Sequence, residues 1–195
     1  MIVVIFAQNI CMAKLFFTWF LIFLASAAGA QDVPVDKSPL DVIYYPANYP
    51  VLKIQDKVSE PPVARLFYSR PQKAGRVVFG ELIEYGKVWR LGANEATELE
   101  LFQPVTVNKT RIKKGRYTLY AIPSEKTWTI IFNRETDTWG TFRYNPEKDI
   151  LRVDLPVSLE ENPAEFFSAA FEKNGKGILL KMKWDKAAVS LPISL

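Results

Sequence analysis

Residues 115–133, GRYTLYAIPSEKTWTIIFN, decide the fold class of this chain. Two runs of alternating apolar and polar residues flank a turn signal at Pro123-Ser124-Glu125. The apolar positions of the two runs are Tyr117, Leu119, Ala121, Trp128, Ile130 and Phe132. Because successive side chains of a strand point to opposite faces, this spacing gives each run one apolar face. The stretch therefore predicts strands of an antiparallel sheet that packs on a core.

The same period of two continues on both sides of this stretch. Further apolar positions that alternate with polar ones are Leu99, Leu101, Leu151, Val153, Leu155, Val157, Ile178, Leu180, Met182, Trp184, Val189, Leu191 and Ile193. Turn signals lie between the runs, at residues 113–115, 145–146, 161–163 and 174–177. No segment sustains a helical period. We expect an all-β fold, an antiparallel β-sandwich of about eight or nine strands with a jelly-roll or immunoglobulin-like architecture. Pro192 indicates an edge position for the last strand.

A segment rich in proline and tyrosine precedes these runs. Residues 31–62 hold six prolines, a density that breaks helices and favours an extended course. Its larger side chains, Tyr44, Tyr45, Tyr49 and Val51, would expose much apolar surface if the segment were free. We therefore expect residues 31–62 to form an N-terminal strap that lies on a β-sandwich domain at residues 63–195.

The N-terminus carries the pattern of an export signal. Residues 15–28, LFFTWFLIFLASAA, form an apolar run of 14 residues, shorter than the roughly 20 that a membrane-spanning helix needs. Lys14 supplies the preceding positive charge, and Ala28-Gly29-Ala30 offers small residues for cleavage. We expect residues 1–30 to be a cleaved signal peptide, translation to start at Met1 or Met12, and the mature protein to be periplasmic or secreted. An uncleaved anchor is the alternative, and the membrane is expected as a partner only through this segment.

The residue types that are missing exclude several kinds of chemistry. The chain has no histidine, and its one cysteine, Cys11, lies ahead of the apolar run. A Ser-His-Asp triad, a Cys-His pair and a histidine-ligated zinc site are therefore excluded, as is a disulfide in the mature chain. No motif for a metal or another cofactor stands out, and we predict neither.

The charge of the chain does not indicate a nucleic-acid partner. Its 25 basic and 21 acidic residues give a formal net charge of +4 and are interspersed along the sequence. Nucleic-acid binding calls for basic residues gathered on one face or helix. We therefore predict no nucleic-acid binding, and the sequence indicates no particular oligomeric state.

The segment Tyr85–Thr97, YGKVWRLGANEAT, concentrates residues that can bind a ligand. Its periodicity is weak, so we expect a structured loop, where binding residues are often found. The candidate ligand-binding residues are Tyr85, Trp89, Arg90, Asn94 and Glu95. A guanidinium can hold a carboxylate or phosphate, amide and carboxylate groups can bond hydroxyls, and an aromatic ring can stack on a sugar face. The same residues also fit a structural role in which Arg90 pairs with Glu95.

A second aromatic loop, ETDTWGTFRY at residues 135–144, follows the strand that contains Trp128. If it lies at the same end of the sandwich, Asp137 and the candidate ligand-binding residues Trp139 and Arg143 complete a cleft. Two carboxylates such as Glu95 and Asp137 could then act as the acid and base of a glycosidase, which needs no histidine. Carboxylate pairs are common on protein surfaces, so no catalytic residue is predicted.

Three long strings of the sequence resemble a known family. They are GRVVFGELIEYGKVWRLGANEAT at 75–97, KKGRYTLYAIPSEKTWTIIFN at 113–133 and DTWGTFRYNPEKDILRV at 137–153. Together with YSRP at 68–71 they resemble domain-of-unknown-function family 2911 of bacterial envelope proteins, over about residues 63–193. The resemblance implies an exported, Bacteroidetes-like β-sandwich protein and implies no activity.

These patterns favour a non-enzymatic, exported binding module. We expect the 89–97 loop to bind a small polar ligand, a glycan or an envelope partner. The alternatives are a histidine-free hydrolase that uses Glu95 and Asp137, and a purely structural envelope module.

Overall fold

The computed structural model describes residues 34–195 of the 195-residue chain. The expected signal peptide at residues 1–30 lies outside the described residues. Residues 36–195 form one compact unit. Within the described part of the chain, no helix is long and apolar enough to span a membrane.

The described residues form ten strands, one short α-helix and one 3-10 helix. The elements are β1 (Leu40–Tyr45), α2 (Tyr49–Ile54), β2 (Ala64–Ser69), β3 (Glu98–Leu101), β4 (Val105–Val107), β5 (Thr110–Ile112), β6 (Gly115–Pro123), β7 (Thr127–Asn133), η1 (Pro146–Lys148), β8 (Asp149–Pro156), β9 (Ser158–Asn174) and β10 (Gly177–Ser194). The strand number slightly exceeds the sequence expectation, because β4 and β5 have three residues each and show little alternation.

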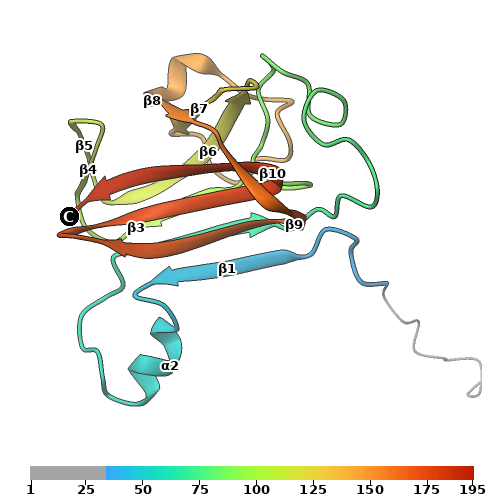
Figure 1. The fold of residues 1–195 in the computed structure, drawn as a ribbon. Helices are drawn as coiled ribbons and strands as arrows, with labels where there is room; N and C mark the ends of the chain where they lie inside the picture. Colours follow the sequence, from blue (N-terminus) through green and yellow to red (C-terminus); the bar gives the residue numbers. More distant parts are fainter. Residues whose placement is uncertain (1–33) are drawn as a thin grey trace, which may run out of the picture. The chain divides into compact units, whose positions relative to one another are not determined.

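Two antiparallel sheets face each other, which confirms the predicted sandwich (Figure 1). One sheet has six strands in the order β1-β2-β3-β6-β7-β8, and the other has four in the order β5-β4-β10-β9. Residues 115–133 form the β6–β7 hairpin, in which Leu119 pairs with Phe132 and Pro123 pairs with Trp128. Its six alternating apolar side chains are all at most 8% exposed. The period of two in the sequence therefore locates the core of the six-stranded sheet.

Large aromatic side chains fill one end of the core between the two sheets. Trp89 contacts both Trp128 and Trp184, with ring centroids 5.6 Å and 6.0 Å away. Phe167 of β9 lies 5.3 Å from the Trp89 ring. Each fully buried side chain of this size stabilises the fold by about 1.5–3 kcal/mol.

The final hairpin differs from the sequence expectation in two respects. The predicted runs 178–184 and 189–193 belong to one strand, β10, which is inner in the strand order of its sheet, so Pro192 is not on an edge strand, although its part of β10 has no β9 partner. Proline is tolerated there because the pairing of β10 with β9 ends at Ala188. The expected turn at 161–163 is instead an irregularity inside β9, which advances from Leu159 to Ala164 while β10 moves only from Ala187 to Asp185.

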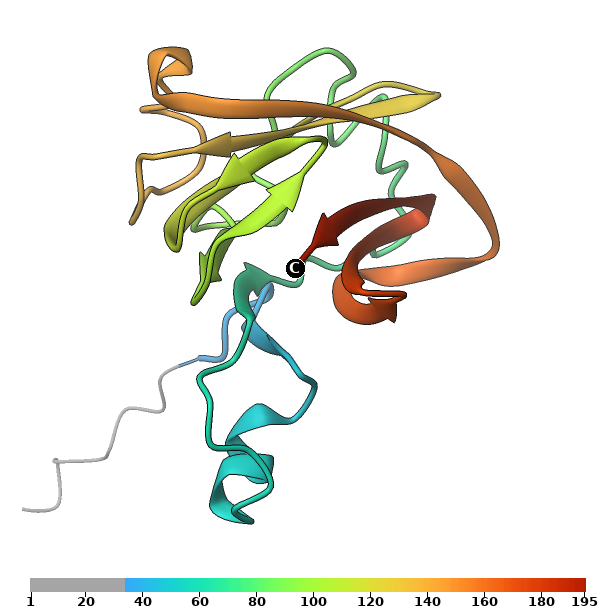
Figure 2. The same ribbon diagram turned by 90° about the vertical axis from the view of Figure 1, so that its left-hand side faces the viewer.

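The segment before β2 is partly extended and partly helical. β1 pairs with β2 along its whole length, from Leu40 opposite Ser69 to Tyr45 opposite Ala64. The helix α2 was not expected; it projects with its flanking loops from the two sheets (Figure 2). Tyr49 of α2 is 8% exposed, whereas Val51, which was expected to hold the segment down, is 52% exposed.

Candidate functional site

The two aromatic loops predicted from the sequence lie side by side. Glu95 and Trp139 form an isolated antiparallel bridge between them. The amide of Ala96 donates to the carbonyl of Thr138 at 3.0 Å, and the amide of Gly140 donates to the carbonyl of Asn94 at 2.9 Å. The 85–97 and 135–144 segments therefore form one surface at the end of the six-stranded sheet.

The first loop is held by a close approach to strand β2. Gly92 has a φ of +154°, and a Cβ added there would lie 3.1 Å from the carbonyl oxygen of Ser69. Thr97 closes the loop, because its hydroxyl donates to the carbonyl of Leu91 at 2.5 Å and its amide donates to the carbonyl of Arg90 at 3.0 Å. Only glycine fits at position 92 without strain, so the sequence LGAN dictates the path of the chain after Arg90.

Trp89 lies in the core instead of on the surface. Its side chain is 3% exposed, and its indole N–H donates to the carbonyl of Gly92 at 3.0 Å. The backbone of Trp89 pairs with Ala121 of β6, and this pairing directs the ring between the sheets. Because the ring is buried, it cannot stack on a sugar. We therefore do not include Trp89 among the residues that could contact a ligand.

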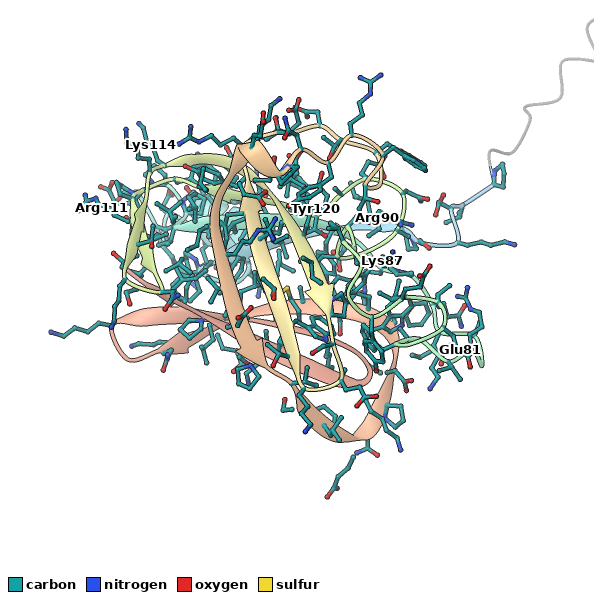
Figure 3. All side chains as sticks on the ribbon, turned by 90° about the horizontal axis from the view of Figure 1, so that it is seen from above. Glu81, Lys87, Arg90, Arg111, Lys114 and Tyr120 are labelled. Carbon is teal, nitrogen blue, oxygen red and sulfur yellow. The ribbon has the colours of Figure 1, made fainter. Side chains whose placement is uncertain are left out.

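Arg90 points to the opposite side of the sheet. Trp89 faces the core, so its neighbours Val88 and Arg90 face outward, and Val88 packs in the small outer cluster that contains Ala96 and Tyr120. The pairing of Trp89 with Ala121 places Arg90 opposite Tyr120, and in the view of Figure 3 the two residues are close together and far from Arg111.

The Arg90 guanidinium has no counter-ion among residues 34–195. None of the ion pairs within that range includes it, so the predicted pair of Arg90 with Glu95 is not formed. Its Nε atom is buried and has no hydrogen-bond partner. Burial lowers the pKa of Arg90 from its ordinary value, because removal from water disfavours the charged form. A partly buried cation without a partner can receive an anion.

The second loop surrounds a hollow with aromatic walls. The hollow has a volume of about 410 Å³ and is lined by Glu135, Thr136, Asp137, Thr138, Trp139, Phe142 and Arg143. Trp139 is 58% exposed and Phe142 is 87% exposed. Thr138 connects the hollow to the Arg90 region, because its hydroxyl lies 3.1 Å from the hydroxyl of Tyr120. Trp139 and Arg143 line this hollow together with Asp137, but no residue of the 85–97 loop does, so a cleft shared by the two loops stays a prediction.

The remaining predicted residues have different surroundings. Asn94 is partly buried in a left-handed conformation, and Glu95 is exposed beside Trp139. Tyr85 is 40% exposed but lines a separate hollow of about 160 Å³ with Ser124 and Lys186. The structure therefore groups Arg90, Asn94, Glu95, Trp139 and Arg143 on two paired loops and leaves Tyr85 outside this group.

Two charged residues that were not predicted support the second loop. Arg116 of β6 forms ion pairs with Glu98 and, at 2.6 Å, with Asp137. The amide of Asp137 also donates to Glu98 Oε1 at 2.5 Å. Sequence reasoning missed Glu98 and Arg116 because neither lies in the two aromatic loops from which the candidate residues were chosen. Their places on the outer faces of β3 and β6, paired strands, were the available signal.

This network bears on the hydrolase alternative. Hydrogen bonding to Arg116 lowers the pKa of Asp137. A glycosidase needs one of its two carboxyl groups protonated near neutral pH, with a raised pKa. Asp137 is held in its ionised form, so it could serve only as the base or nucleophile of such a pair, and the acid would have to be Glu95, which is exposed and does not line the hollow beside Asp137. Within the described part of the chain, no cluster of three or more metal-ligating side chains occurs.

Comparison with known proteins identifies a family and no characterised relative. A family model described as "Protein of unknown function (DUF2911)" matches residues 50–193. No curated protein sequence and no solved structure matches the chain.

Proposed function

This chain belongs to the DUF2911 family of proteins of unknown function, and we propose that its β-sandwich is a binding module for a small anionic ligand. The ligand class is a carboxylate, a phosphate or an acidic sugar. Following the export pattern at the N-terminus, we propose that the module works in the periplasm or outside the cell.

The state of Arg90 is the observation that carries this proposal. A buried donor without a partner costs about 1–3 kcal/mol, and the described residues supply no partner to Arg90 Nε. Because Nε is buried, a carboxylate or phosphate reaches it only when the Arg90 side chain shifts outward, and it would then accept from Nε and a terminal N–H together, since the planar guanidinium favours two parallel hydrogen bonds. Binding would therefore remove the desolvation cost of the unpartnered Nε that the free protein has.

The hollow in the second loop, which is paired with the first loop but is not lined by Arg90, offers the surface for the rest of the ligand. Trp139 presents an exposed ring, and Thr136 and Thr138 supply hydroxyl groups in the same hollow. A volume of about 410 Å³ falls in the range of small-molecule sites, roughly 300–1,000 Å³. An exposed tryptophan beside polar groups suits a sugar or another ring with hydroxyl groups.

Two alternatives have less support. The hydrolase requires a protonated and an ionised carboxyl group that face one cleft; Arg116 keeps Asp137 ionised, and Glu95, the other candidate, does not line the hollow that contains Asp137. The purely structural module predicts that Arg90 pairs with Glu95, and these two residues form no ion pair within residues 34–195.

Thermal unfolding with acetate, citrate, inorganic phosphate and glucuronate as probes tests the proposal. A ligand at one hundred times its Kd should raise the Tm by about 5–10 °C. Arg90→Gln should abolish the increase for every active probe. Arg111→Gln is the matched control, because Arg111 is an exposed arginine at the far end of the molecule. An increase that persists in Arg90→Gln, or no increase with any probe, would contradict the proposal.

A further inference from the structure

A second hollow lies between the α2 segment and the beginning of strand β2. It has a volume of about 710 Å³ and is lined by Tyr44, Tyr49, Pro50, Lys53, Ile54, Ser59, Pro61, Pro62, Arg65 and Phe102. Arg65 is near the first residue of β2, whereas the Arg90 loop approaches Ser69 at the other end of that strand. The second hollow is therefore separate from the Arg90 site.

Stacked aromatic rings fix one wall of this hollow. The rings of Tyr44 and Tyr49 stack with centroids 6.1 Å apart and planes at 22°. The hydroxyl of Tyr49 donates to the carbonyl of Glu60 at 3.0 Å, which joins α2 to the returning chain. These contacts link β1, α2 and the 55–62 segment, so the wall exists without a ligand.

The floor of the hollow is an arginine held among aromatic rings. The guanidinium carbon of Arg65 lies 5.8 Å from the ring centre of Tyr44, 4.7 Å from that of Phe67 and 5.6 Å from that of Phe102. Arg65 also pairs with Glu100 on β3. Its charge is thus already compensated, and it holds the rings in place.

The rim combines an exposed apolar group with an unpaired cation. Ile54, the last residue of α2, is 84% exposed and lines the hollow. Lys53 precedes it, also lines the hollow and takes part in none of the ion pairs within residues 34–195. The residues that line the hollow include no aspartate or glutamate. Covering Ile54 would stabilise a complex by about 25 cal/mol for each Å² of apolar surface removed from water.

We infer that this hollow is a second binding site, for a small molecule with an aromatic or other apolar ring body and one anionic group. The ring lies against Tyr44, Phe102 and Ile54, and the anionic group pairs with Lys53. The charge of the lining selects against cations, and its proline and aromatic walls favour a flat body over an extended polar chain.

A fluorescence titration with 8-anilinonaphthalene-1-sulfonate tests this inference, because the probe carries a flat aromatic body and one sulfonate. We expect saturable binding at one site. Ile54→Asp, which places a negative charge at the apolar rim, should raise the Kd about tenfold or more. Lys53→Gln should raise it about threefold to tenfold, and more at low salt than at high salt.

Matched controls separate binding in this hollow from binding elsewhere on the protein. Lys57→Gln removes an exposed lysine from the same segment that does not line the hollow, and should leave the Kd unchanged. Arg90→Gln should also leave it unchanged, so failure here is distinguishable from failure of the proposed function. Because the dye also binds partly unfolded proteins, chemical-shift changes at the amides of Tyr44 and Tyr49 should accompany the fluorescence. Equal affinity in Ile54→Asp and the unmodified protein, or non-saturable binding, would overturn the inference.

Discussion

Replacement of Arg90 by methionine should stabilise the free protein. The substitution removes a buried Nε that has no hydrogen-bond partner, which relieves about 1–3 kcal/mol of desolvation cost. Methionine keeps most of the apolar stem and loses no ion pair, because Arg90 forms none within residues 34–195. Allowing for imperfect packing of the new side chain, we expect the free energy of unfolding to rise by about 1 kcal/mol and the Tm by about 2–4 °C.

Urea unfolding followed by tryptophan fluorescence measures this change, because Trp89, Trp128 and Trp184 are buried in the core. Arg65→Met is the matched comparison. Arg65 pairs with Glu100 and lies 4.7 Å from the Phe67 ring centre, so its loss should lower the free energy of unfolding by about 1–2 kcal/mol. If Arg90→Met lowers it by as much as Arg65→Met does, Arg90 has a structural role and the reasoning about its missing partner is refuted.

Three further substitutions test other parts of the structure. Arg116→Met should lower the free energy of unfolding by about 2 kcal/mol, because it leaves the Glu98 carboxylate, 10% exposed, without its cation; a change below about 0.5 kcal/mol in urea unfolding would contradict this. Burial, with a hydrogen bond to Asp149, raises the pKa of Tyr144 to about 12, above its unfolded value of about 10. Its contribution to stability is therefore complete below pH 10 and declines as pH rises toward 12; Tyr144→Phe should reduce this alkaline decline, and identical pH profiles would count against the shift. Gly92→Ala should cost about 1–3 kcal/mol through its positive φ and the close Ser69 carbonyl, with weaker anion binding in the same titrations; an unchanged Tm would show that the loop adapts.

The core could be predicted from the sequence wherever a strand pairs regularly on both sides. The alternation around Leu119 and Ile130 identifies buried positions because those strands have one face toward the opposite sheet. Alternation failed in β9, where four residues of β9, 160–163, lie opposite one residue of β10, and the exposed residues outnumber the buried ones. The helix α2 was missed because six residues with a proline give too short a pattern to recognise.

The candidate site was predicted in part. The two loops and the residues Arg90 and Trp139 were identified from their composition, since they concentrate polar and aromatic side chains outside the strands. The orientation of Trp89 could not be deduced, because it depends on the pairing of Trp89 with Ala121, 32 positions later in the chain. The sequence also could not predict that Arg90 lacks a counter-ion. Glu95 is only five positions away along the chain, but the bridge between the loops places it beside Trp139.

The side-chain Nε–H resonance of Arg90, followed by ¹⁵N NMR during titration with the most effective anionic probe, tests anion binding by Arg90 most directly. We predict a saturable shift of this resonance and slower exchange of its proton with water, because the buried Nε gains an acceptor. The Nε–H signals of exposed arginines such as Arg111 should not follow the same curve. An Arg90 resonance that stays in place, or one that moves only in parallel with Arg111, would contradict the account.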